Sequence, residues 1–225
     1  MAELKNKVVF ITGASSGIGR ETAYKFAAEG ARLALTYFNN KEEANKVVKK
    51  CEELGAPDVL MLKLDIRDNE NIREVVKQII AQFGKIDVLI NNAGVIEWGP
   101  LEKETLEGIE NQIRVNLEGL IKLTRECLPY IEDSIVNITS GAGIRAHPTL
   151  ATYCATKFGV RGFTQTMALE YPQLRIFAVN PDTTAMAMTD YEGRPPEVVA
   201  EVILKAAKDE YGIPNGGDVN VWEVL

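Results

Sequence analysis

Short apolar runs alternate along this chain with longer stretches in which apolar residues recur every three or four positions. The short runs are rich in Val, Ile and Leu and have the length of β-strands. Several are apolar almost throughout, as expected of parallel strands that are buried on both faces. The predicted strands span residues 7–12, 32–37, 59–64, 88–91, 134–139, 175–180 and 218–222.

The longer stretches between these strands predict amphipathic helices. Gly30, Gly55 and Gly84 are expected to end the first three, because glycine readily takes the left-handed conformation that closes a helix. Asp68 is a predicted N-cap of the third helix. The predicted helices span residues 17–30, 41–54, 69–83, about 106–130, about 152–171 and about 196–210.

The strict alternation of strands and helices predicts an α/β fold. It is typical of a doubly wound parallel sheet, here of about seven strands with helices on both faces. No linker, internal repeat or low-complexity tract interrupts the pattern, so we expect one domain over residues 1–225.

Composition narrows the classes of protein that the chain can belong to. It has 225 residues, of which 46% are hydrophobic, and a net charge of −7 that disfavours a nucleic-acid surface. No run approaches the roughly 18 apolar residues of a membrane span, and the N-terminus lacks a signal pattern. We therefore expect a soluble, cytoplasmic protein with no membrane or nucleic-acid partner. The three cysteines are widely spaced without a C-x-x-C pair, so neither a disulfide framework nor a metal site is expected.

A glycine-rich turn, TGASSGIG, joins the first strand to the first helix. Gly13 suits a tight turn, Gly17 leaves room for phosphate oxygens, and Gly19 lets the helix approach the sheet. The helix N-terminus offers unpaired N–H groups to a pyrophosphate, and the alternative is a purely structural turn. The expected cofactor contacts here are Gly13, Ser15, Ser16, Gly17, Ile18 and Gly19.

Two further strand ends carry candidate cofactor contacts, at the edge where doubly wound sheets bind ligands. A second glycine turn, with Asn92, Ala93 and Gly94, follows the fourth strand directly. Asp65, followed by Ile66, closes the third strand. Its carboxylate either accepts a hydrogen bond from an adenine amino group or caps the next helix together with Asp68.

The end of the second strand bears on which nicotinamide cofactor fits. An acidic residue there binds the ribose 2′-hydroxyl and repels a 2′-phosphate. The strand ends at Tyr37 and is followed by Phe38, Asn39, Asn40 and Lys41, so the first acidic residue is Glu42. The pattern favours NADP, with the lysine close to the phosphate, and NAD is the alternative.

A tyrosine, a lysine and a serine indicate proton transfer. Lys157 follows Tyr153 by four residues, one helical turn, and Ser140 precedes that tyrosine by thirteen residues. A tyrosine–lysine pair alone is often a solvated surface feature. The glycine turn upstream and the serine favour a cleft in which a hydride carrier and an acid–base group meet.

With these motifs in this order, the chain resembles the short-chain dehydrogenase/reductase family, most closely its 3-oxoacyl-carrier-protein reductases. The match runs from TGASSGIG through Asp65, the NNAG turn, Asn116 in RVNLEG and Ser140 to Tyr153-x-x-x-Lys157. The resemblance implies a Rossmann-type fold that binds NADP or NAD. It also implies assembly into homodimers or homotetramers, in which the two long helices pack against their symmetry mates.

The resemblance further implies a catalytic tetrad of Asn116, Ser140, Tyr153 and Lys157. A carbonyl that accepts hydride needs a proton donor and a hydrogen-bonding partner for its oxygen. Tyr153 would be the donor, and the charge of Lys157 would favour its phenolate. Lys157 would also hold the nicotinamide ribose. Ser140 would orient the substrate oxygen, and Asn116 would support a water from an irregular point in its helix.

The match fails after the sixth strand. The family has Asn-Pro-Gly there and a threonine that contacts the nicotinamide amide. This chain has Asp182 in place of the glycine and Met186 in place of the threonine. The remaining expected cofactor contacts in this loop are Pro181, Thr183 and Thr184.

The substrate lid that family members carry is short in this chain. The sequence passes from Met188 through TDYEGRPP into the last helix. A lid excludes water and shapes the pocket. A short lid indicates an open cleft, a loose or bulky substrate, or a partner that supplies the missing wall. The residues expected to line the opening or to pack beside it are Ile96, Trp98, Ile144 and His147.

The function predicted is that of an NAD(P)-dependent oxidoreductase. It would act on a small-molecule carbonyl or secondary alcohol, with Tyr153 as the general acid and base. The alternative is a non-catalytic dinucleotide-binding sensor or scaffold, which Asp182 and the short lid favour.

Overall fold

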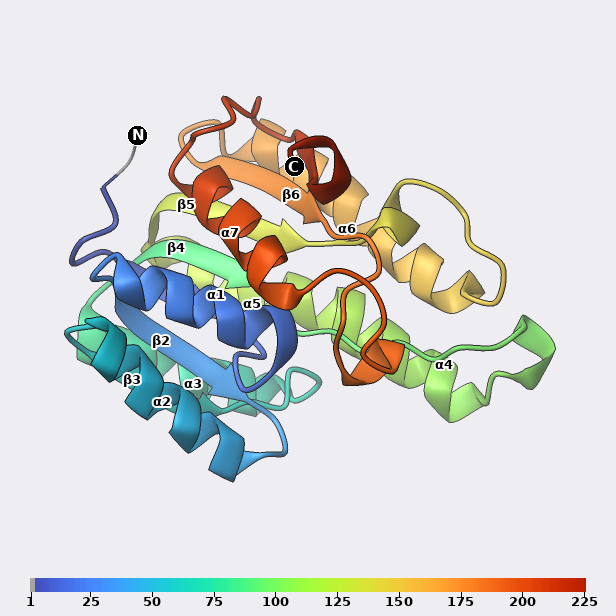
Figure 1. The fold of residues 1–225 in the computed structure, drawn as a ribbon, viewed down its shortest axis with the longest axis horizontal. Coiled ribbons are helices and arrows are strands. Elements are labelled where there is room, and N and C mark those ends of the chain that lie inside the picture. Colours follow the sequence, from blue (N-terminus) through green and yellow to red (C-terminus); the bar gives the residue numbers. More distant parts are fainter. Residues whose placement is uncertain (1–2) are drawn as a thin grey trace.

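The computed structural model describes residues 3–225, and its centre is a single parallel sheet (Figure 1). The strands lie in the order β3-β2-β1-β4-β5-β6-β7, and every neighbouring pair is parallel. This order confirms the doubly wound prediction, because the sheet grows in opposite directions from β1 and β4. The strands are β1 (Val8–Ile11), β2 (Arg32–Tyr37), β3 (Val59–Lys63), β4 (Ile86–Asn91), β5 (Ile131–Ile138), β6 (Arg175–Asn180) and β7 (Asp218–Asn220).

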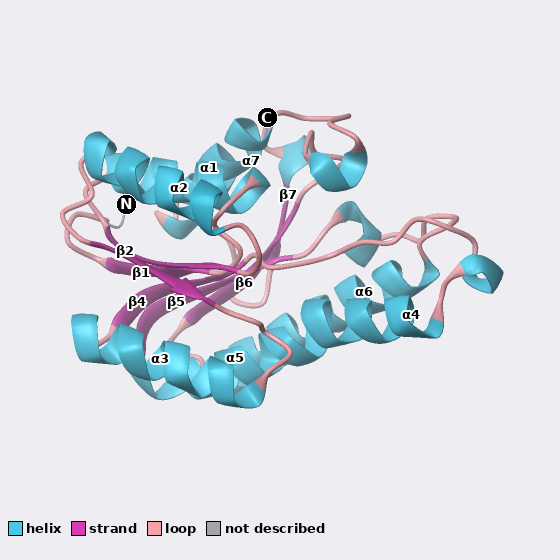
Figure 2. Cartoon of the chain, turned by 90° about the horizontal axis from the view of Figure 1, so that it is seen from below, coloured by secondary structure: helices cyan, strands magenta, loops and turns pink. Residues whose placement is uncertain are grey.

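Helices cover both faces of the sheet (Figure 2). On one face lie α1, α2 and α7, and on the other α3, α5 and α6, with α4 extending beyond the sheet. Their bounds are α1 (Gly17–Ala28), α2 (Lys41–Leu54), α3 (Asn69–Phe83), α4 (Leu106–Ile113), α5 (Leu120–Cys127), α6 (Ala151–Glu170) and α7 (Pro196–Ala207).

Two hydrophobic clusters hold the layers together. In β1, Val9 and Ile11 belong to the cluster that includes Phe26 of α1, while Val8 and Phe10 belong to the cluster on the opposite face. The side chains of a strand alternate between faces, so a central strand covered on both sides must be apolar throughout. The near-continuous apolar runs in the sequence therefore reflect burial on both faces.

The predicted helix ends are mostly confirmed. Gly55 and Gly84 close α2 and α3 with φ angles of +112° and +79°. Asp68 caps α3 by accepting hydrogen bonds from two backbone N–H groups of its first turn. Helix α1 ends at Ala28, and Gly30, with φ of +75°, turns the chain toward β2.

The helix predicted over residues 106–130 is divided. Helix α4 runs into a π-helical segment, Arg114–Gly119, which is followed by α5 and a 3-10 turn, Leu128–Tyr130. A Cβ on Gly119 would lie 2.6 Å from the Ile66 carbonyl oxygen, so only glycine permits this close approach. The predicted last strand is also shorter, because residues 221–223 form a 3-10 turn.

Between residues 3 and 225, none of the helices has both the length and the apolar character needed to cross a membrane. Over the same residues, no group of three or more His, Cys, Asp or Glu side chains is placed to hold a metal ion.

Candidate active site

A cavity of about 730 Å³ opens at the carboxyl ends of the central strands. It spans the point between β1 and β4 where the strand order reverses, the usual ligand crevice of such sheets. Of the predicted catalytic and cofactor-contact residues, Gly19 and Asn116 do not line it. Lys41, expected near the 2′-phosphate, and Ile144, expected at or beside the opening, do not line it either. Those that do are Gly13, Ser15, Ser16, Gly17, Ile18, Tyr37, Phe38, Asp65, Ile66, Asn92, Ala93, Gly94, Ser140, Tyr153, Lys157, Pro181, Thr183 and Thr184.

The glycine turn has the geometry that its residues suggested. Gly13 and Gly17 have φ angles of +66° and +53°, which residues other than glycine rarely adopt. A Cβ on Gly19 would lie 2.3 Å from the Gly13 carbonyl oxygen, so α1 packs directly onto the turn. Ser16 at the N-cap makes no side-chain hydrogen bond to α1. The first N–H groups of the helix can therefore meet an anion in the cavity.

The second glycine turn braces the first. The Thr12 hydroxyl accepts hydrogen bonds from the N–H groups of Asn92 and Ala93, both at 2.9 Å. In return the Asn92 amide donates to the Thr12 carbonyl at 2.8 Å and to the Gly13 carbonyl at 3.2 Å. The two turns are therefore locked together, although they are about 80 residues apart in the chain.

Asp65 is paired with an arginine at the far end of the cavity. Its carboxylate accepts hydrogen bonds from Arg67 Nε and Nη2, each at 2.8 Å, and these hold its pKa below the usual range. The Arg67 guanidinium lies over the Phe38 ring, 5.1 Å from its centroid. Asp68 alone caps α3, so the capping alternative for Asp65 is wrong. No local motif had pointed to Arg67.

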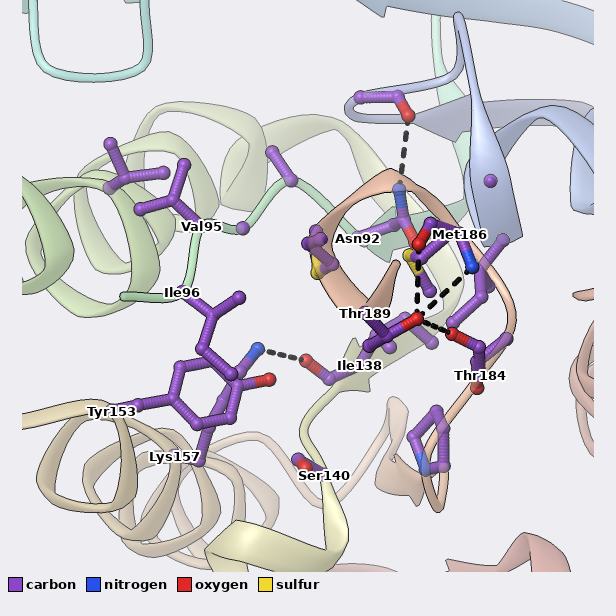
Figure 3. Close-up of a pocket in the computed structure, with 18 of the residues that line it drawn as sticks. Asn92, Val95, Ile96, Ile138, Ser140, Tyr153, Lys157, Thr184, Met186 and Thr189 are labelled. Carbon is purple, nitrogen blue, oxygen red and sulfur yellow. Dashed lines mark hydrogen bonds between the residues drawn. The ribbon is translucent and has the colours of Figure 1, made fainter. Parts of the chain in front are cut away.

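Tyr153 and Lys157 project from α6 toward the end of β5, where Ile138 and Ser140 lie (Figure 3). Lys157 is buried, and its Nζ donates a hydrogen bond to the Ile138 carbonyl at 3.0 Å. The same nitrogen lies 5.6 Å from the centre of the Tyr153 ring. The Ser140 hydroxyl accepts from Ala142 N–H at 3.1 Å, which starts the turn after β5. One surface thus carries a phenol, an ammonium and a hydroxyl.

The pKa values of the tyrosine and lysine are governed by burial. Burial raises the pKa of Tyr153 to about 12, and the Ser140 hydroxyl lowers it only in part. Burial also lowers the pKa of Lys157 to about 8. The expected lowering of the tyrosine pKa by the lysine is not observed, because removal from water disfavours the charged form of both groups. At neutral pH the phenol keeps its proton, and most of the lysine is charged.

Asn116 lies in the π-helical segment, which confirms the irregularity expected there. Its amide accepts from Val95 N–H and donates to the Val95 carbonyl, both at 2.8 Å. It also donates to the Thr156 hydroxyl at 3.3 Å, and that hydroxyl donates to the Tyr153 carbonyl at 2.7 Å. Thr156, which the sequence did not single out, therefore ties Asn116 to the helix that carries the tyrosine.

The short lid segment, residues 182–194, is called the strap below. Asp182 accepts two hydrogen bonds from Arg194, at 2.9 Å from Nε and 2.6 Å from Nη2. Backbone hydrogen bonds from Arg194 N to Thr183 O and from Ala185 N to Arg194 O, both 2.8 Å, close the neck of the strap. Asp182, which departs from the family pattern, is thus one half of a clamp.

The tip of the strap is held against the cavity from two sides. The Met186 sulfur would lie 3.2 Å from a Cβ on Gly17, and Trp98 Nε1 donates to the Met188 carbonyl at 3.1 Å. Figure 3 shows Thr184, Met186 and Thr189 across the pocket from Tyr153. The short segment is therefore an anchored wall on this side of the cavity.

Comparison with known proteins adds to this geometry. The family described as short chain dehydrogenase matches residues 7–196. The 3-oxoacyl-[acyl-carrier-protein] reductase FabG of Thermotoga maritima is 36% identical, over 97% of this chain and 97% of its own length. A short-chain dehydrogenase from Burkholderia cenocepacia, solved in complex with NADP, superposes with a TM-score of 0.90 at 27% identity, covering 97% of each chain. A Serratia marcescens short-chain dehydrogenase/reductase gives the same TM-score at 26% identity and the same coverage.

Proposed function

The chain belongs to the short-chain dehydrogenase family and is an NAD(P)-dependent oxidoreductase acting on CH–OH groups, and on that premise we propose that Tyr153 transfers the proton in its reaction. The observation that carries this proposal is the meeting of Tyr153, Lys157 and Ser140 in the cavity that the glycine turn also lines. The reaction consumes a ketone, NADPH and a proton and yields a secondary alcohol and NADP⁺, or the reverse.

The residues of the cavity fit a nicotinamide dinucleotide. The N–H groups at the glycine turn would hold the pyrophosphate, and Phe38 and Asp65 would contact the adenosine. Pro181 and Thr184 lie where the nicotinamide end would reach. When bound, the reduced nicotinamide supplies the hydride. These contacts are proposals that rest on the lining of the cavity.

The proton moves between side chains of this protein and the substrate oxygen. The Tyr153 O–H bond breaks as a new O–H bond forms on the former carbonyl oxygen, which also accepts a hydrogen bond from Ser140. The phenolate that remains lies near the Lys157 ammonium, whose Nζ is 5.6 Å from the centre of the ring. Asn116 and Thr156 would position the helix and the loop that carry these groups.

We propose NADP rather than NAD as the preferred cofactor. No acidic side chain ends β2, so nothing there repels a 2′-phosphate. Arg67, which lies over the Phe38 ring and is paired with Asp65, has its guanidinium at the same end of the cavity. A structural relative bound to NADP is consistent with this choice.

We also propose that residues 1–225 form one domain and that the protein assembles as a homodimer or homotetramer. Large apolar side chains are exposed along α4 to α6, on the helices that the family resemblance places at an interface. They are Leu106, Ile113, Ile121, Phe158 and Leu169. Sedimentation equilibrium measures the state directly, and a monomer at micromolar concentration contradicts the proposal.

The proposed reaction is tested with a panel of ketones, 3-oxoacyl thioesters and quinones. Oxidation of NADPH is followed by absorbance, and cofactor binding is followed separately by fluorescence. Turnover of a carbonyl compound supports the oxidoreductase mechanism. Cofactor binding without turnover across the panel favours a non-catalytic sensor or scaffold, the alternative to which the unusual Asp182 and the short strap point.

A further inference from the structure

Among residues 3–225, two charged side chains that line the cavity form no ion pair, Lys157 and Arg145, and of these Lys157 is buried and already takes part in the proposed reaction. Asp65 is paired with Arg67 at the adenosine end, and Asp182 is paired with Arg194 in the strap. Arg145 also lines the cavity and is exposed, yet within residues 3–225 it forms no ion pair. An unpaired guanidinium in a cavity of a protein with net charge −7 is a ready site for an anion.

Arg145 is held in place by the turn after β5. Its N–H donates to the Gly141 carbonyl at 3.1 Å, and its guanidinium lies over the Trp222 ring, 6.0 Å from the centroid. This turn begins at Ser140, and a 3-10 turn rises about 2 Å per residue. The Cα of Arg145 therefore lies within roughly 10 Å of the Cα of Ser140. His147, on the same loop, also lines the cavity.

The topology separates Arg145 from the phosphates of the cofactor. The pyrophosphate site is at the end of β1 and the 2′-phosphate site is at the end of β2, whereas Arg145 follows β5. Neighbouring strands lie about 4.8 Å apart, so β5 is roughly 10 Å from β1 and roughly 14 Å from β2. The stack on Trp222, which follows β7, draws the guanidinium farther away.

We propose that the substrate carries an anionic group, a carboxylate or a phosphate ester, which Arg145 binds while Ser140 and Tyr153 form hydrogen bonds to the carbonyl oxygen. This inference rests on the proposed reaction. The planar guanidinium matches both anions through two parallel hydrogen bonds. The substrate is therefore a keto acid or a keto phosphate, with the anion a few bonds from the reacting carbon.

The test compares matched anionic and neutral ketones. Acetoacetate is paired with its methyl ester, and hydroxyacetone phosphate is paired with hydroxyacetone. In Arg145→Ala, kcat/KM for the preferred anion is expected to fall about 10- to 100-fold, mainly through KM, since a hydrogen bond to a charged group is lost. The neutral partners are expected to change little, and Arg145→Lys is expected to retain part of the preference. Whether kcat/KM is higher for acetoacetate or for hydroxyacetone phosphate shows whether the anionic group of the substrate is a carboxylate or a phosphate.

Arg125→Ala is the matched control, because Arg125 lies on α5 with 78% of its side chain exposed and carries the same charge. Equal activity on anionic and neutral ketones, unchanged in Arg145→Ala, overturns the inference.

If no ketone is reduced, the proposed reaction itself fails, and a binding measurement then tests the inference separately. Equilibrium dialysis of acetoacetate and hydroxyacetone phosphate against NADPH-saturated Tyr153→Phe is then expected to show binding that Arg145→Ala abolishes; absent or unchanged binding refutes it.

Discussion

Two walls of the cavity are built in different ways. The nucleotide floor, residues 12–19 and 92–94, is held by backbone conformation and by glycines that leave no room for a side chain. The strap, residues 182–194, is closed by two backbone hydrogen bonds at its neck and by the half-exposed Asp182–Arg194 ion pair. The floor follows the family pattern, whereas the strap departs from it. The cofactor is shared across the family, and the strap is where one member can differ from another.

The contrast has a physical basis. A clash of a Cβ with backbone atoms cannot be relieved without moving a strand or a helix, so the floor tolerates little change. A half-exposed ion pair contributes little stability and can be exchanged at small cost. Substitutions in the floor and at the proton donor are therefore expected to have much larger effects than substitutions of the Asp182–Arg194 pair in the strap.

The largest effect is expected at Tyr153, between the two walls. Tyr153→Phe removes the proton donor and keeps the ring, so turnover is expected to fall about 10³-fold, within the range for loss of a general acid. Affinity for NADPH is expected to stay within about twofold. Steady-state kinetics and a fluorescence titration measure the two quantities, and a variant with full activity contradicts the assignment of the acid.

The next largest effect is expected in the nucleotide floor. Gly19→Ala would place a Cβ 2.3 Å from the Gly13 carbonyl oxygen, so the turn must shift. Affinity for NADPH is expected to fall about 10- to 100-fold, corresponding to the usual cost of overpacking. Gly162→Ala on α6 is the matched control, because its Cβ would meet no atom within 4 Å. Equal NADPH affinity in the two variants would show that the floor is not rigid.

Cofactor preference tests the adenosine end of the floor. The KM for NADPH is expected to be about tenfold lower than that for NADH, because charge-assisted hydrogen bonds to the 2′-phosphate are gained. Arg67→Ala is expected to narrow this difference. A strong preference for NADH, measured with both cofactors at a saturating ketone concentration, contradicts the choice of NADP.

Lys157 gives a pH dependence with opposite signs for activity and stability. Its pKa is lowered to about 8 from 10.5, so the rate of reduction is expected to fall as pH rises above about 8. Between about pH 8 and 10 the unfolded state binds more protons than the native state at this group, and stability therefore rises with pH. Reduction rates and thermal unfolding, each measured as a function of pH, test both expectations. In Lys157→Met the contribution of this group to the change of stability with pH is expected to vanish. Parallel loss of rate and stability in the wild type would indicate general unfolding instead.

The smallest effect is expected in the strap. Asp182→Asn weakens the clamp on Arg194, and a half-exposed pair of this kind contributes about 1 kcal/mol or less. The KM for substrate is expected to rise about three- to fivefold, with kcat nearly unchanged and Tm within about 4 °C of the wild type. Arg194→Gln should behave alike, and the exchange Asp182→Arg with Arg194→Asp should recover part of the loss. Additive losses in the exchanged variant would show that the pair does not act as a clamp.

Much of the fold could be predicted because strands and helix ends depend on residues that are close together in the sequence. The apolar runs of β1 and β4, the stops at Gly55 and Gly84 and the cap at Asp68 all follow from residues near each other in the chain. The broken helix was harder to place. The family resemblance indicated an irregular point at Asn116, whereas the close approach of Gly119 to the Ile66 carbonyl follows from no local pattern.

The residues of the candidate site likewise fall into those that local motifs predicted and those that only the tertiary structure placed there. The glycine turn, Ser140, Tyr153 and Lys157 could be named beforehand, since each lies in a short motif whose backbone geometry is local. The tertiary structure alone decided that Arg67 lies over the Phe38 ring, that Asp182 and Arg194 close the strap and that Arg145 forms no ion pair within residues 3–225. Such contacts depend on how the loops at the strand ends fold against one another. Burial, which moves the pKa values of Tyr153 and Lys157, depends on everything packed around them.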